Sequence, residues 1–116
     1  MPGCLLHLET PKNLTDTNNT GSLSQQGVMA HELAHDWMTA FYPGIREDWI
    51  KEGFAEYIAW RYNRYKKRNK LNIRVENNTD PVYGEGFRRI RKIAQNRGFA
   101  GLRKFLEFKS KQNRKE

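Results

Sequence analysis

Hydrophobic residues recur at helical spacing through most of the chain and predict helices separated by turn residues. Ser22 and Gln25 have the spacing of a capping box, which satisfies the first free N–H groups of a helix. Apolar residues then recur every three or four positions, at Val28, Leu33, Ala34, Trp37, Met38 and Phe41. Because proline and glycine end helices, the first helix is predicted to stop at Pro43-Gly44.

A second helix is predicted to begin at Glu47 and Asp48, whose carboxylates favour the positive end of a helix. Its apolar stripe consists of Trp49, Ile50, Phe54, Tyr57, Ile58 and Tyr62. The stripe runs into a basic stretch, so we expect this helix to fray near Arg68. Residues 69–80 are predicted to form a loop, with a short strand at 71–75.

A third helix is predicted to start at Asp80-Pro81, because proline is favoured at the first helical position. Its inner face contains Tyr83, Phe87, Ile90, Ile93 and Ala94. Gly98 is suited to cap its C-terminus. A short fourth helix follows, with Leu102, Phe105 and Leu106 buried and Phe99 as a further candidate.

The two ends of the chain lack this periodicity. Residues 9–22 are polar and rich in Thr and Asn, which indicates a loop, and residues 4–8 allow one short strand. The chain is therefore divided into an N-terminal segment 1–22, a helical domain 23–108 and a basic solvated tail 109–116. The predicted fold class is mainly α, with about four helices and at most a short N-terminal strand.

Length and composition limit the class of protein. The chain has 116 residues, 37% of them hydrophobic, which is enough for one domain with a modest core. No apolar run is long enough to cross a bilayer, and the N-terminal sequence lacks the features of a signal peptide. The single cysteine, Cys4, excludes an internal disulfide and fits a reducing compartment. We therefore expect a cytoplasmic protein without a membrane partner.

The net charge of +8 first suggests a nucleic-acid binder. The charge is uneven, however, because residues 1–60 hold three basic and eight acidic side chains. Residues 61–74 hold seven basic side chains and no acid, and residues 88–116 hold eleven against two. No nucleic-acid-reading motif accompanies these basic runs, so they are interpreted as solvated helix faces, and a nucleic-acid partner is not expected.

The first predicted helix carries an H-E-x-x-H pattern at residues 31–35. Residues four apart lie on one face of a helix, so His31 and His35 can bind a single zinc ion. Glu32 is then close enough to act as general base on a metal-bound water. Glu52 is predicted to be the third ligand. The second helix descends from the turn to Glu52 by about the distance that the first helix rises beyond His35, so Glu52 returns to the level of the histidines.

Further carboxylates are predicted to support these ligands. Glu56 lies one turn after Glu52 and is suited to accept a hydrogen bond from the second nitrogen of a ligand histidine, while Asp36 competes for that role. Gly53 is expected to let the first two helices pack closely. The simpler alternative is that the histidines are ordinary partly buried residues and that Glu52 and Glu56 are ordinary helical carboxylates.

Residues 31–35, followed by W-I-K-E-G-F-A-E-Y at 49–57, resemble the gluzincin zinc metallopeptidases. The short gap between them is similar to that of the plant organ-size-control LIM-domain peptidases, a ubiquitin-activated family. H-E-L-A-H-D-W-M (31–38) and D-P-V-Y-G-E-G-F-R (80–88) are similar to that family's H-E-M-M-H-A-W-M and S-P-V-Y-G-D-G-F-R. The resemblance implies the helical half of a zinc-peptidase domain acting on protein or peptide substrates. It also implies that Tyr83 donates a hydrogen bond to the tetrahedral intermediate.

Three functions follow as hypotheses. The first is a zinc peptidase, and the second is a non-catalytic, zinc-stabilised protein-interaction module. The third is a basic nucleic-acid-binding protein. Only about 25 residues precede the zinc helix, too few for the substrate-pairing sheet of such peptidases. That sheet is therefore expected to be missing or to be supplied by a partner. The G-x-M-E-N segment of aminopeptidases is also missing, so aminopeptidase activity is not expected.

Overall fold

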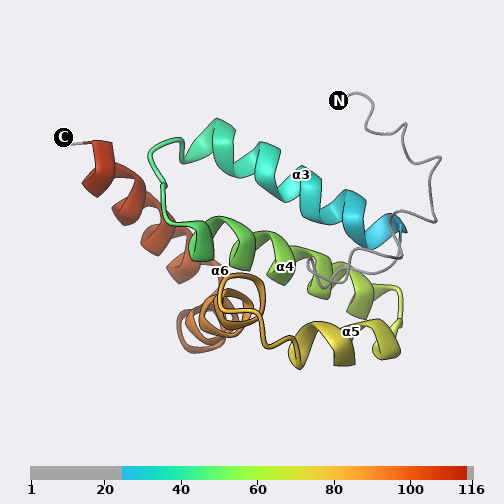
Figure 1. The fold of residues 1–116 in the computed structure, drawn as a ribbon. Coiled ribbons are helices and arrows are strands. Elements are labelled where there is room, and N and C mark those ends of the chain that lie inside the picture. The colour runs from blue at the N-terminus through green and yellow to red at the C-terminus, as the bar shows by residue number, and fades with distance from the viewer. Residues whose placement is uncertain (1–24, 115–116) are drawn as a thin grey trace.

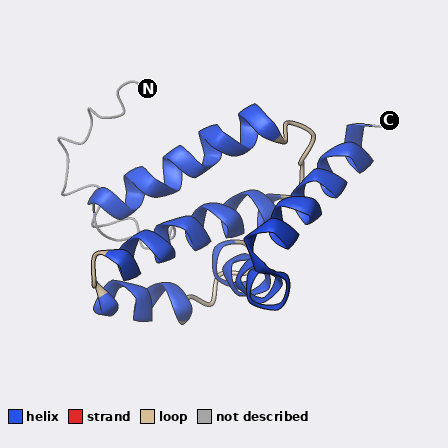
Figure 2. Cartoon of the chain, turned by 180° about the vertical axis from the view of Figure 1, so that it is seen from behind, coloured by secondary structure: helices blue, strands red, loops and turns tan. Residues whose placement is uncertain are grey.

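A computed structural model describes residues 25–114 of the chain as a set of packed helices (Figures 1 and 2). The helices are α3 (Gln25–Phe41), α4 (Asp48–Tyr65), α5 (Asn69–Glu76) and α6 (Tyr83–Arg114). No strand lies within these residues, so the mainly α prediction is confirmed. The predicted strand at 4–8 and the Ser22 cap lie outside the described residues. None of the described helices is both long and apolar enough to cross a membrane.

Helices α3 and α4 form an antiparallel hairpin, joined by a short connection at 42–47 (Figure 1). At one end of the hairpin, the Tyr62 hydroxyl donates to Gln26 Oε1 at 3.2 Å. Further along, Glu52 contacts His35. The contact between Glu52 and His35 confirms that the second helix, α4, returns Glu52 to the level of the histidines. The hairpin encloses buried apolar side chains from both helices, among them Ala34, Met38, Ile50 and Phe54.

Helix α6 crosses α4 at a pair of glycines. A Cβ placed on Gly53 would lie 2.4 Å from the carbonyl carbon of Gly86, and one on Gly86 would lie 2.5 Å from the carbonyl oxygen of Trp49. The prediction for Gly53 was therefore wrong in its partner, because this glycine allows α4 to approach α6 and not α3. Phe87, next to the crossing, is fully buried.

The stretch predicted as a loop with a short strand at 71–75 is helix α5, Asn69–Glu76. Its β-branched residues favour a strand locally, but packing against α4 and α6 overrides that preference. Val75 is buried on the inner face, and the side-chain amide of Asn72 donates to the backbone carbonyl of Trp60 at 3.0 Å. The predicted strand is thus wrong, and the helix is held by contacts distant in sequence.

Helix α6 begins at Tyr83, two residues after Pro81, the predicted first helical position, and it has the predicted break at Gly98. The Asp80 carboxylate accepts hydrogen bonds from the backbone N–H groups of Val82 and Tyr83, both at 2.8 Å, as an N-terminal cap does. Gly98 has φ 76° and ψ 174°, a conformation open only to glycine, and it divides α6 into two helical segments. Leu102 and Leu106 of the second segment are buried as predicted, whereas Phe99 is 39% exposed.

The predicted solvated tail at 109–116 is wrong for the part that the structure describes. Helix α6 continues to Arg114, and Ser110 is buried, where its hydroxyl accepts a hydrogen bond from the backbone N–H of Gly44 at 3.0 Å. Glu47 accepts a further hydrogen bond from the side chain of Asn113 at 3.1 Å. The last turns of α6 therefore pack against the connection between α3 and α4.

Candidate metal centre

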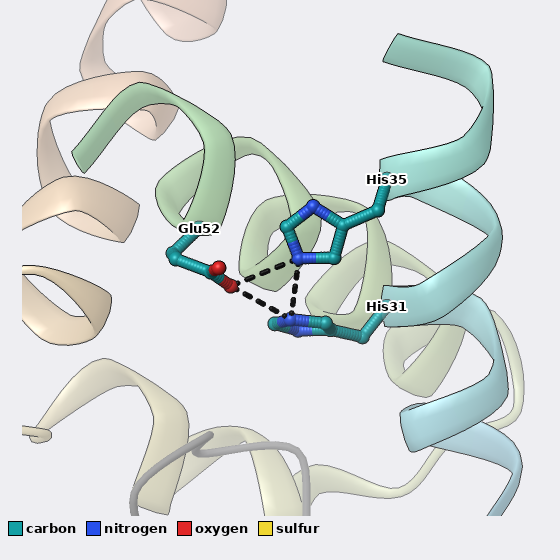
Figure 3. A group of neighbouring side chains, drawn as sticks. All are labelled: His31, His35 and Glu52. Carbon is teal, nitrogen blue, oxygen red and sulfur yellow. Dashed lines mark hydrogen bonds and ion pairs between the residues drawn. The ribbon is translucent and has the colours of Figure 1, made fainter. Parts of the chain in front are cut away.

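His31, His35 and Glu52 meet where α3 packs against α4 (Figure 3). The Nε2 atoms of the two histidines are 3.1 Å apart. Glu52 Oε1 lies 3.0 Å from His31 Nε2 and 2.9 Å from His35 Nε2. Three potential ligand atoms therefore form a nearly equilateral triangle, as the helical spacing of the histidines and the returning second helix predict.

The size of this triangle fits a zinc ion. Tetrahedral ligands about 2.0–2.1 Å from zinc are separated from one another by roughly 3.3 Å. The observed separations of 2.9–3.1 Å are only a few tenths of an ångström shorter. Two imidazoles and one carboxylate are also a donor set that zinc enzymes use, and they leave a fourth position for water or substrate. The three side chains thus form a group that could hold a metal ion, and their spacing and donor types suit zinc.

Proton binding within the cluster is strongly perturbed. Burial alone would lower the pKa of His31, but its hydrogen bonds to Glu52 and Glu56 raise it to about 9. Burial alone would raise the pKa of Glu52, but hydrogen bonds from His31 and His35 lower it to about 2. Without metal, the folded cluster therefore keeps a proton on His31 at neutral pH, and a metal ion has to displace it.

The metal-free protein is expected to lose stability as the pH rises from 6.5 to 9. The pKa of His31 in the folded protein, about 9, lies above its ordinary value of 6.5. The stabilisation from this proton is therefore fully present below pH 6.5 and is lost as the pH passes 9. Urea denaturation across this range measures it, with the zinc-saturated protein as the control. If the metal-free protein is equally stable at pH 6.5 and pH 9, His31 does not hold this additional proton in the folded protein.

Glu56 supports the first histidine from inside the protein. Its side chain is 1% exposed, and its Oε2 atom lies 2.7 Å from His31 Nδ1. Because Nδ1–H donates to this carboxylate, Nε2 faces the other two ligand atoms, and its lone pair becomes available to a metal once His31 loses its additional proton. This is the contact predicted for Glu56.

Replacing Glu56 with glutamine is expected to weaken zinc binding by roughly 10–100-fold, since the amide holds the His31 tautomer less firmly. Competition with a chromophoric chelator measures the affinity. Asp36→Asn is the matched control because it removes one negative charge from the same hairpin outside the cluster. Equal affinities of the two variants would show that Glu56 has no part in the site.

Asp36 makes none of the hydrogen bonds or ion pairs described for the ligand histidines. It is exposed and lines a groove of about 730 Å³ on another face of α3. The other lining residues are Ala30, Leu33, Ala34, Trp37, Phe54, Ile58, Tyr62 and Phe99. The structure therefore does not support the prediction that Asp36 competes for the role of Glu56. The carboxylate that contacts the ligand histidine His31 is that of Glu56.

Two further residues, Glu32 and Tyr83, are predicted to act at the cluster, and the structure places Tyr83 in contact with it. Glu32 is exposed on α3, directly after His31. The ring of Tyr83 stacks on that of His31, with centroids 6.0 Å apart and an angle of 14° between the planes. Burial and the neighbouring carboxylates of Glu52, Glu56 and Asp80 raise the pKa of Tyr83 above its ordinary value. The phenol thus stays protonated at neutral pH and is able to donate a hydrogen bond.

The packing of Gly86 against Gly53 is a feature of this site that the sequence interpretation missed. This close approach brings the start of α6, and with it Tyr83, against the cluster. The available signal was a pair of glycines, each inside a helical pattern, where glycine is unfavourable unless a close contact requires it. That signal indicates a close contact but does not identify the partner.

Comparisons with known proteins do not assign the chain to a family. No protein-family model, curated protein or solved structure matches the chain. The function is therefore inferred from the chemistry of the residues themselves.

Proposed function

We propose that this protein is a zinc-dependent metallopeptidase that hydrolyses peptide bonds in protein or peptide substrates. The observation that carries the proposal is the convergence of His31 Nε2, His35 Nε2 and Glu52 Oε1 within 3.1 Å of one another. The resemblance of these residues and their surroundings to gluzincin motifs supports the same assignment. When bound, zinc supplies a Lewis acid that polarises water and the scissile carbonyl.

The neighbouring residues have complementary roles in this proposal. Glu32 is exposed, so that water and substrate can reach its carboxylate. It accepts the proton of the attacking water and passes it to the leaving amine. Tyr83, protonated at neutral pH, donates a hydrogen bond to the carbonyl oxygen as negative charge develops there. Glu56 keeps His31 in the tautomer that presents Nε2.

Replacing Glu32 with glutamine is expected to leave zinc binding intact and to lower kcat/KM on an unstructured protein by about 10²–10⁴-fold, the usual contribution of a general base. Cleavage of casein and zinc content are measured on the same preparation. Glu107→Gln, an equivalent change on the exposed surface of α6, is the control. Cleavage that survives Glu32→Gln would falsify this mechanism.

A second candidate function is a non-catalytic module in which zinc stabilises the fold for protein interaction. The observation that favours it is that the ligands come from both α3 and α4, so a bound ion would clamp the hairpin whether or not a substrate is present. In this case the wild-type protein would bind zinc and gain stability but cleave no member of a broad peptide pool. The casein and peptide-pool assays therefore separate the two functions.

A further inference from the structure

Three arginines and two aromatic residues line a pocket between α4 and α6. Tyr57, Trp60, Arg61 and Arg64 follow one another at helical spacing on α4, and Arg91 and Gln95 face them from α6. The pocket has a volume of about 400 Å³, within the range of small-ligand sites. None of these residues belongs to the metal cluster, so the pocket is independent of the proposed function.

The aromatic rings hold the guanidinium groups in place. The central guanidinium carbons of Arg64 and Arg91 lie 4.9 and 5.4 Å from the centroid of the Trp60 ring. Arg61 lies over the Tyr57 ring at 5.9 Å. Both rings are buried and stack on each other, with centroids 5.8 Å apart. Cation–π contacts of this kind orient arginines before a ligand arrives, which lowers the entropic cost of binding.

The positive charge of the pocket is only partly neutralised. Glu76 accepts a hydrogen bond from Trp60 Nε1 at 2.8 Å, and the same oxygen lies 3.9 Å from an Arg91 nitrogen. Among residues 25–114, no carboxylate forms an ion pair with Arg61 or Arg64. Three guanidinium groups thus meet one carboxylate, which leaves about two positive charges for a ligand.

We propose that this pocket binds a phosphate monoester group. Such a group carries about −1.5 to −2 charges at neutral pH, which matches the uncompensated charge, and its oxygens suit the planar fork of arginine. Tyr57 and Trp60 are buried, and guanidinium groups already lie over their rings. No ring face is left on which a nucleobase can stack, so the pocket recognises the phosphate and not a base.

The ligand is either a small phosphate ester or a phosphorylated side chain of a protein, and isothermal titration with both distinguishes them. The probes are phenyl phosphate, a phosphoserine peptide and its unphosphorylated counterpart, added to the zinc-loaded full chain. Saturable binding of one phosphate per chain is expected, with no binding of the unphosphorylated peptide. Tighter binding of the phosphopeptide than of phenyl phosphate identifies a protein ligand, and the reverse identifies a small ester.

Two double variants test the location. Arg61→Gln with Arg64→Gln removes two exposed side chains of the pocket, and we expect roughly tenfold weaker phosphate binding for each lost charge-assisted contact. Lys92→Gln with Arg97→Gln removes the same charge from another basic pocket on α6 and is expected to change the affinity less than twofold. Circular dichroism verifies that both variants fold.

Three results would overturn the proposal. One is the absence of saturable binding of either phosphate probe by the wild-type protein. Another is an equal loss of binding in the two double variants, which would indicate general attraction to positive charge. The last is tighter binding of a single-stranded RNA oligonucleotide than of the phosphate probes, since that would identify an extended polyanion as the ligand.

Discussion

We expect the wild-type protein to bind about one zinc ion per chain and the Glu52→Ala variant to lose it. Structural zinc sites with four ligands have apparent binding free energies of about 10–16 kcal/mol, or about 3 kcal/mol per ligand, so losing one weakens binding on the order of 10²-fold or more. Glu52 Oε1 contacts both histidine nitrogens within 3.0 Å, and no other carboxylate has that position in the described cluster. Metal analysis after gel filtration measures the stoichiometry.

The controls for this prediction separate ligand loss from misfolding. His31→Ala is expected to lose zinc in the same way, whereas Glu107→Ala, on the exposed surface of α6, is expected to retain it. Circular dichroism establishes whether each variant is folded. If Glu52→Ala retains full zinc content, the third ligand is not Glu52. If His31→Ala retains it as well, the cluster is not a zinc site.

A single methyl group on Gly53 is expected to destabilise the fold by about 3 kcal/mol or more, at the upper end of overpacking effects. The added Cβ would lie 2.4 Å from a backbone carbon of Gly86, which cannot rotate away as a side chain can. Helices α4 and α6 then have to separate, and Tyr83 moves away from His31. Because folded domains are stable by about 5–15 kcal/mol, this is a large fraction of the total. Urea denaturation of Gly53→Ala measures it.

Gly98→Ala is the matched control for this effect. A Cβ at that position meets no atom within 4 Å, but the φ of 76° is unfavourable for alanine. The cost is then backbone strain of about 1–3 kcal/mol, far from the cluster in sequence, and the zinc affinity is expected to be unchanged. By contrast, Gly53→Ala is expected to lower both stability and zinc affinity. If the stability of Gly53→Ala is within about 0.5 kcal/mol of the wild type, α4 and α6 do not approach each other as closely as described.

The features that the sequence predicts well depend on neighbouring residues. Helices α3 and α4 follow from apolar periodicity and from the turn at Pro43-Gly44. The meeting of His31, His35 and Glu52 follows from the rise of the two helices. All of these residues lie on the α3–α4 hairpin, where the geometry of the two helices fixes the positions of the side chains relative to one another.

The features that it misses depend on distant partners. Helix α5 contains β-branched residues whose local preference is for a strand, but burial of Val75 against other helices decides the outcome. Residues 109–114 look like a solvated tail because they are rich in lysine and polar residues. Their contacts, Gly44 with Ser110 and Glu47 with Asn113, join residues 66 positions apart. Neither periodicity nor composition contains that information, and the same is true of the pairing between Gly53 and Gly86.

The contact between Gly44 and Ser110 has a consequence for the order of folding. It closes a chain segment 66 residues long, whereas the contacts of Glu52 with His31 and His35 close segments of 21 and 17 residues. Because the entropic cost of closure grows with segment length, the α3–α4 hairpin is expected to form before the end of α6 docks. All three proposed zinc ligands lie on that hairpin, so the metal would be bound early, and docking of the last turns would complete folding.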